Sequence, residues 1–80
     1  MITVSIEYFA MLREQRGMTK EQLSVDAATP TDLYRQLRER HGFTLPGDRV
    51  RAAVNGDFVE STHPLRDGDE VVFIPPVAGG

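Results

Sequence analysis

The strongest constraint on the fold is the apolar pattern, in which one helical segment lies between segments that alternate apolar and polar residues. Near the start, every second residue is apolar or aromatic: Ile2, Val4, Ile6 and Tyr8. This period predicts a strand with one face on a core. Residues 18–26 alternate in the same way, after a short helical turn from Ala10 to Arg16 that Gly17 closes. This first part of the chain therefore predicts a β-hairpin.

A single longer helix is predicted in the middle of the chain. Thr29 is a good N-cap residue, and Pro30 is favoured at the first helical position. Leu33 and Leu37 lie one turn apart, so they should face the sheet. Gly42 is a natural left-handed stop. We therefore expect the helix to begin after Thr29 and to end at Gly42.

The second half of the chain predicts the remaining strands. Residues 50–54 alternate, and Asn55-Gly56 is a typical hairpin turn that leads to a short strand at 58–60. After a turn at Asp67-Gly68-Asp69, residues 71–74 form the last strand. This order predicts an α+β fold, with one main helix packed on a mixed sheet. It suits the β-grasp, in which the first and last strands pair in parallel at the centre.

The last strand leads directly to a narrow C-terminal arm, which consists of Pro75, Pro76, Val77, Ala78, Gly79 and Gly80. Proline lacks an N–H, so Pro75 and Pro76 end strand pairing. Gly79 and Gly80 have no Cβ, so their backbone can enter a channel too narrow for side chains. We expect residues 75–80 to be a flexible tail on a single domain, 1–80, with the carboxylate of Gly80 as the reactive group. The alternative is an inert tail.

Composition excludes several kinds of function. The chain has no cysteine, so it has no disulfide, thiolate metal site or persulfide of its own. Its formal net charge of −3 argues against nucleic acid as a partner, because binding there depends on neutralising phosphates. No apolar run approaches the roughly 20 residues of a membrane span. We therefore expect a cytoplasmic protein that binds neither nucleic acid nor membrane.

Three segments carry a resemblance to a known family. They are Phe9-Ala10-Met11-Leu12-Arg13-Glu14, then Ala52-Ala53-Val54-Asn55, and then the run from His63 through Asp67-Gly68-Asp69-Glu70 to Pro75-Pro76-Val77-Ala78-Gly79-Gly80. Together they resemble the small subunit of molybdopterin synthase, a ubiquitin-like sulfur carrier. The match is densest in the C-terminal part of the chain. The loop from Gly42 to Arg49 matches no part of this pattern.

The resemblance implies a specific chemistry at Gly80. An enzyme like those that activate ubiquitin would adenylate the terminal carboxylate with ATP and magnesium, because a carboxylate alone is a poor electrophile. A sulfur donor protein would then convert it to a thiocarboxylate. The loaded tail would insert into the large subunit, within a heterotetramer, and donate sulfur to a cyclic pyranopterin precursor of the molybdenum cofactor. The small subunit would hold no metal and no permanent cofactor.

A partner face is expected on the side of the sheet away from the helix. If alternate residues of the first and last strands face the core, then Phe9, Val72 and Ile74 face outward. Phe58, beside an exposed turn, should join them in an apolar patch typical of interfaces. The resemblance places the large-subunit contact in the same region, with Arg13 beside it. The alternative is that Phe9 or Phe58 closes the edge of the core.

Other polar residues are expected to have structural roles. The acids Asp67, Asp69 and Glu70 lack the spacing of a calcium loop, and Asp-Gly is a common turn. His41 and His63 have no acid or thiol at the spacing of metal ligands or of a catalytic triad. Three arginines should follow the solvated face of the helix, where they could still meet the activating enzyme: Arg35, Arg38 and Arg40.

Two other functions fit the same tail. A sulfur carrier for thiazole synthesis, tRNA thiolation or amino-acid synthesis would share the Gly80 chemistry and serve another acceptor. A protein modifier would instead join Gly80 to a target lysine. The Pro75-Pro76-Val77 stem and the His63-Pro64-Leu65 segment favour molybdopterin.

Overall fold

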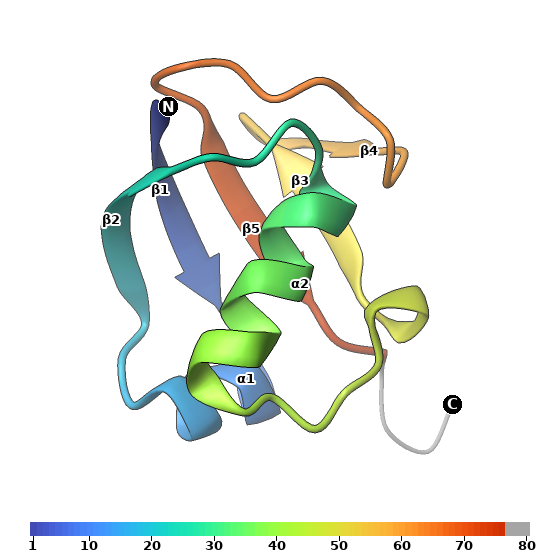
Figure 1. The fold of residues 1–80 in the computed structure, drawn as a ribbon. Helices are drawn as coiled ribbons and strands as arrows, with labels where there is room; N and C mark the ends of the chain where they lie inside the picture. Colours follow the sequence, from blue (N-terminus) through green and yellow to red (C-terminus); the bar gives the residue numbers. More distant parts are fainter. Residues whose placement is uncertain (77–80) are drawn as a thin grey trace.

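The computed structural model describes residues 1–76, which form a mixed sheet with one long helix across one face (Figure 1). The strands are β1 (Ile2–Tyr8), β2 (Lys20–Val25), β3 (Arg51–Val54), β4 (Asp57–Val59) and β5 (Glu70–Ile74). The helices are α1 (Ala10–Arg16), α2 (Pro30–His41) and the 3₁₀ helix η1 (Gly47–Arg49). No helix in this part of the chain is long and apolar enough to cross a membrane.

The first and last strands pair at the centre of the sheet. The strand order is β2-β1-β5-β3-β4. β1 and β5 run parallel, with Ile6 opposite Val71 and Tyr8 opposite Phe73. The other pairs, β1 with β2, β3 with β4 and β3 with β5, are antiparallel. The predicted β-grasp arrangement is confirmed.

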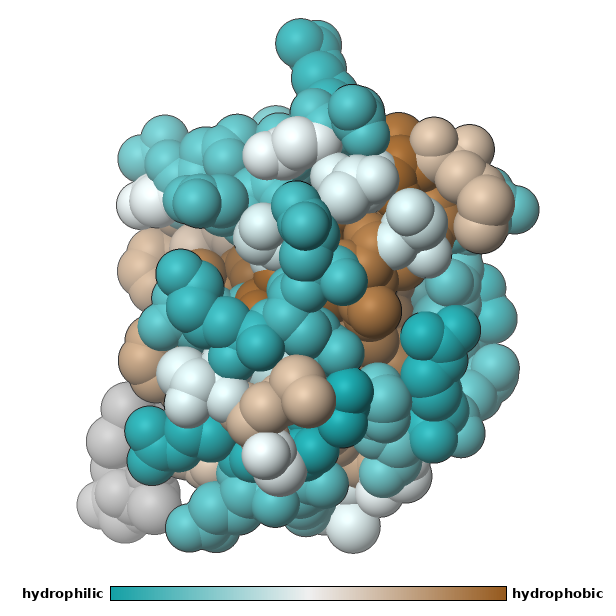
Figure 2. Space-filling model, turned by 90° about the vertical axis from the view of Figure 1, so that its left-hand side faces the viewer, coloured by the Kyte–Doolittle hydropathy of each residue, from teal (hydrophilic) through white to brown (hydrophobic). Residues whose placement is uncertain are grey.

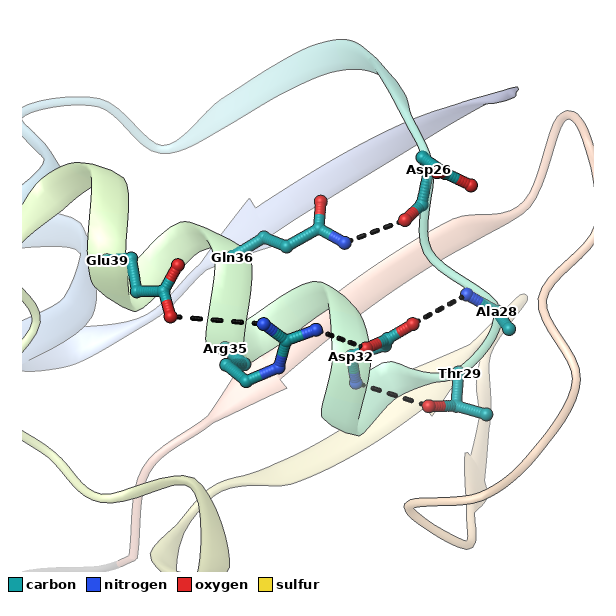
Figure 3. A network of polar contacts seen from close by, with 7 residues as sticks. All are labelled: Asp26, Ala28, Thr29, Asp32, Arg35, Gln36 and Glu39. Carbon is teal, nitrogen blue, oxygen red and sulfur yellow. Dashed lines mark hydrogen bonds and ion pairs between the residues drawn. The ribbon is translucent and has the colours of Figure 1, made fainter.

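Helix α2 begins and ends where its sequence predicts. The hydroxyl of Thr29 accepts a hydrogen bond from the Asp32 N–H at 3.2 Å. The carboxylate of Asp32 also accepts from the Ala28 N–H at 3.3 Å and pairs with Arg35 at 2.6 Å, so the first turn is tied to the preceding loop (Figure 3). At the other end, Gly42 has a φ of 72° and donates to the carbonyl of Arg38.

The core lies between α2 and the inner face of the sheet. Its fully buried side chains come from β1, β5 and both helices: Val4, Ile6, Tyr8, Leu12, Leu33, Leu37, Val71 and Phe73. No role was predicted for the loop from Gly42 to Arg49, yet Phe43 within it is only 3% exposed. Its ring stacks on Tyr34 at 5.9 Å between centroids and meets the edge of Tyr8 at 5.7 Å. This loop therefore closes the core beneath α2.

The turn before β5 is built by aspartate side chains. Asp69 is 9% exposed, and its carboxylate accepts from the Asn55 side-chain amide at 2.9 Å and from the Arg66 N–H at 2.8 Å. Asp67 accepts from the Thr3 N–H at 2.7 Å. Within residues 1–76, no three His, Asp or Glu side chains are grouped as metal ligands. The turn role predicted for Asp67 and Asp69 is confirmed by these hydrogen bonds.

Helix α1 forms a sharp corner between β1 and β2. Ala10 has a φ of 51°, a left-handed conformation that costs about 1 to 2 kcal/mol for a residue other than glycine. Two side chains of α1 bind other parts of the chain: Gln15 exchanges hydrogen bonds with Thr44, and Arg16 forms a bidentate ion pair with Glu21 at 2.7 and 2.8 Å. Tertiary contacts therefore hold this corner.

The edge of the sheet formed by β2 is polar on its outer side. Figure 2, seen from the β2 side, shows hydrophilic residues over most of the surface, with hydrophobic atoms visible between them near the middle. Lys20, Gln22 and Ser24 are exposed, while Val25 is buried. Such charged and polar edges discourage pairing with strands of other molecules.

Replacing Thr29 by Ala should lower the free energy of unfolding by about 1 kcal/mol, because the Asp32 N–H loses its cap. Urea unfolding of the purified variant measures this. Thr31→Ala is the matched control, since the Thr31 side chain forms no hydrogen bond within the described residues. If Thr29→Ala and Thr31→Ala lower the free energy of unfolding equally, the role of the cap is contradicted.

Acid should remove part of the stability that Glu21 supplies. The hydrogen bond from Arg16, followed by that from Tyr8, holds the pKa of Glu21 below its usual value. Its contribution is therefore complete above the unfolded pKa, about 4.3, and disappears as the pH falls through the lower folded pKa. Glu21→Gln should cost about 1 kcal/mol at pH 7, and this difference should shrink by pH 3 in urea titrations. A difference that is independent of pH would contradict this.

Candidate functional site

The outer face of the sheet, away from α2, carries a row of neighbouring side chains. The strand register places Glu7 beside Val72, Val72 beside Ala53, and Ala53 beside Phe58. Side chains that are paired in this way lie on the same face. Phe58 is 61% exposed, whereas Ala53 is 8% exposed between its two neighbours. Phe58 therefore does not close the core edge, which was the alternative interpretation.

A second row follows at the end of β5 from which the tail leaves. Ile74 lies opposite Arg51 on β3. On the other side, Tyr8 pairs with Phe73, and Phe9 continues β1 in extended conformation, with φ −122° and ψ 154°. Continued by one residue, the parallel register sets Phe9 opposite Ile74. Phe9 is 41% exposed, so it does not belong to the buried core either.

Arg51 is a member of this face that sequence reasoning missed. Its guanidinium lies over the ring of Phe58, 4.6 Å from the centroid. This cation–π contact covers one side of an exposed aromatic ring and leaves a positive charge beside it. The sequence signal that could have identified Arg51 is its position two residues before Ala53 on an alternating strand. We call the set Phe9, Arg51, Ala53, Phe58, Val72 and Ile74 the outer patch.

Arg13 lies next to the outer patch on helix α1. The carbonyl of Phe9 accepts hydrogen bonds from the N–H groups of Leu12 at 3.1 Å and Arg13 at 3.4 Å. The first turn of α1 is thus tied directly to Phe9. Leu12 is fully buried and Arg13 is exposed. The structure therefore places Phe9, Phe58, Val72 and Ile74 on the outer face and Arg13 one helical turn from Phe9, exposed on α1.

The tail leaves from the middle of this surface. β5 ends at Ile74, Pro75 is buried and Pro76 is exposed. The end of β5 is flanked by the end of β1 and the start of β3, because Tyr8 pairs with Phe73 and Arg51 with Ile74. The remaining predicted tail residues lie outside the described part of the chain: Val77, Ala78, Gly79 and Gly80.

Two hollows border the outer patch, and the described residues that line them form no catalytic constellation. One, of about 440 Å³, lies between α2 and the β3–β4 hairpin and is lined by Tyr34, Arg51 and Phe58 among others. A smaller one of about 160 Å³ on the outer face is lined by Glu7, Lys20 and Val72 among others. An apolar surface with arginine at its edge suits protein docking.

The two histidines lie apart from this surface. His41 is the last residue of α2, and burial followed by the charge of Arg16 lowers its pKa. His63 lies in the turn after β4, where its N–H donates to the carbonyl of Glu60. Both positions, at a helix end and in a turn, agree with the structural roles expected from the sequence.

Comparison with known proteins identifies close relatives. A protein named molybdopterin synthase sulfur carrier subunit from Escherichia coli is 36% identical over 80 residues, covering 96% of this chain and 99% of its own length. The protein of the same name from Mycobacterium tuberculosis is 39% identical over 83 residues and is covered completely, as is this chain.

Solved structures share the fold. The small archaeal modifier protein 1 of Haloferax volcanii superposes with a TM-score of 0.79 at 26% identity, covering 96% of this chain and 100% of that protein. One chain of a complex of subunits 1 and 2 of molybdopterin-converting factor from Helicobacter pylori gives a TM-score of 0.67 at 24% identity, covering 99% and 100% of the respective chains.

The family comparison covers the fold, the outer patch and the tail together. The model of the ThiS family matches residues 6–80, from the middle of β1 to the last glycine. With this match and with relatives of the same length, the chain belongs to the ThiS family of ubiquitin-like β-grasp proteins.

Proposed function

We propose that this protein is the sulfur carrier subunit of a molybdopterin synthase. The observation that carries the proposal is the relationship over the whole chain to proteins with that name, including the Gly79-Gly80 end. The absence of cysteine from the sequence supports it, because sulfur must then be carried by another group. In this proposal the group is the carboxylate of Gly80.

The proposed chemistry proceeds in two steps at the carboxyl group of Gly80. A carboxylate oxygen attacks the α-phosphorus of ATP on the activating enzyme, and pyrophosphate leaves. Hydrosulfide released by a donor protein then attacks the carbonyl carbon, and AMP leaves with the electron pair of the broken C–O bond, which gives a thiocarboxylate. Adenylation is required because the carboxylate itself is a poor electrophile. ATP and magnesium would be bound by the activating partner, and this chain would contribute only the acyl group.

The large subunit is the proposed partner of the outer patch. Docking there would direct the tail away from the sheet and into the partner, because β5 ends among the patch residues Phe9, Arg51 and Ile74. The catalytic side chains would belong to the large subunit, in a heterotetramer. The thiocarboxylate would donate its sulfur to a cyclic pyranopterin precursor.

A protein modifier remains the second candidate. The likeness to the small archaeal modifier protein 1 favours it, since that protein shares the fold over nearly the whole chain. Both functions begin with an adenylated terminal glycine. They differ in the nucleophile that follows, which is sulfur for a carrier and a lysine amine for a modifier.

Loading with sulfur should depend on Gly80. Incubation of the full chain with an activating enzyme, ATP and a sulfur donor should exchange one oxygen for sulfur, as measured by intact mass. A chain without Gly80 should stay unloaded and yield no molybdopterin with the large subunit. Its unfolding midpoint should stay the same, because the core of the described residues ends at Phe73.

Thr29→Ala, which changes stability far from the tail, should load as the unaltered chain does. Molybdopterin formation by the chain without Gly80 would contradict the mechanism. A bond between Gly80 and a target lysine, in place of the exchange of oxygen for sulfur, would favour the protein-modifier function.

Replacing Ile74 by Lys should weaken binding to the large subunit. The new charge would lie unpaired in an apolar contact, so the dissociation constant should rise by about ten-fold or more. Titration calorimetry with the purified large subunit measures it. Ser24→Lys is the matched control, because Ser24 is exposed on the edge strand β2, opposite Thr3 and far from the end of β5. If the Ile74→Lys variant binds the large subunit as tightly as the unaltered chain does, Ile74 does not belong to the interface.

A further inference from the structure

We propose that Arg16 and Glu21 form a clamp that positions Phe9 and Arg13 for partner docking. This inference rests on the proposed function, and it assigns a role in that function to two residues outside the outer patch. Arg16 and Glu21 are positioning residues here, because they act through α1 and do not themselves lie on the outer patch.

The local sequence of α1 supports the helix only weakly. The helix has seven residues, its N-cap Phe9 makes no side-chain capping bond, and its first turn contains no acid. Isolated helices shorter than about 12 residues are marginal in water. The left-handed Ala10, with φ 51°, adds strain at the point of entry. The orientation of α1 must therefore come from tertiary contacts.

The clamp is a bidentate ion pair between α1 and β2. Arg16 Nε and Nη2 donate to the two carboxylate oxygens of Glu21 at 2.7 and 2.8 Å. The two side chains are 21% and 10% exposed, so water screens them less than a surface pair. Bidentate pairs of this kind fix the geometry as well as the distance. Arg16 is the last residue of α1, so the clamp holds the end of the helix farthest from Phe9.

Glu21 is itself anchored to the rigid centre of the fold. It lies opposite Ile6 in the β1–β2 register. The buried Tyr8 donates its hydroxyl hydrogen to Glu21 at 2.6 Å. Tyr8 pairs with Phe73 on β5 and contacts the ring of Phe43. Through Glu21 and Tyr8, Arg16 is therefore linked to the central strands β1 and β5, and β5 leads into the tail.

The clamp connects to the outer patch through the backbone of α1. The Phe9 carbonyl accepts from Leu12 and Arg13, and the Gly17 N–H donates to the Arg13 carbonyl at 2.9 Å. If the last turn of α1 loosens, these bonds weaken together, and Phe9 and Arg13 sample other positions. A partner that binds only one arrangement of Phe9 and Arg13 then has a lower affinity. Its affinity falls in proportion to the fraction of time that the chain spends in that arrangement.

The test is the affinity of Arg16→Lys for the purified large subunit. Lysine keeps the charge and loses the bidentate geometry, so the dissociation constant should rise by about three- to ten-fold. Arg66→Lys is the matched control, because Arg66 is exposed and forms no ion pair within residues 1–76. Thr29→Ala controls for stability, and it should leave the affinity unchanged.

Two further measurements separate positioning from general stability. In a background of Phe9→Ala and Arg13→Ala, Arg16→Lys should cause no additional loss of affinity, because it acts through those residues. Amide hydrogen exchange of the free variant should be faster at Leu12, Arg13 and Gly17 and unchanged in β1 and β5.

Unchanged affinity for Arg16→Lys, or a loss that adds fully in the Phe9 and Arg13 background, would overturn the clamp while leaving the proposed function intact. Failure of the unaltered chain to bind the large subunit would overturn both the proposed function and this positioning role.

Discussion

The parallel pairing of β1 and β5 is the contact on which the rest of the structure depends. It places Ile6 beside Val71 and Tyr8 beside Phe73, all nearly or fully buried. α2 covers these side chains on the inner face. On the outer face, the same register brings Phe9 next to Ile74. One pairing therefore builds the core, aligns the outer patch and determines where the tail leaves the sheet.

Much of this arrangement could be predicted because it is encoded locally. Alternation in β1 and β5 indicates which side chains face inward, since neighbouring residues of a strand point to opposite faces. Thr29 and Gly42 bound α2 through hydrogen bonds and a left-handed φ that those residue types favour. Asn55 and Gly56 adopt positive φ values of 52° and 91°, as expected for a two-residue hairpin turn.

The features that sequence missed depend on contacts between distant segments. Phe43 follows a helix stop in a loop, and only the packing of Tyr8 and Tyr34 around it shows that it is a core residue. Arg51 appears ordinary until the register brings Phe58 beside it. Glu21 lies on the edge strand β2, and its partners Arg16 and Tyr8 come from two other elements. Parity predicted Phe9, Val72 and Ile74 of the outer patch, and the neighbouring turn predicted Phe58, but Arg51 and Ala53 were not predicted.

The separation of β1 and β5 along the chain also has a consequence for biosynthesis. Their contacts join residues more than 60 positions apart, and such non-local contacts form late because the intervening loop must close first. The nascent polypeptide cannot complete its central sheet until β5 has emerged from the ribosome. A partner that recognises the outer patch would therefore bind only chains in which these distant strands have already paired.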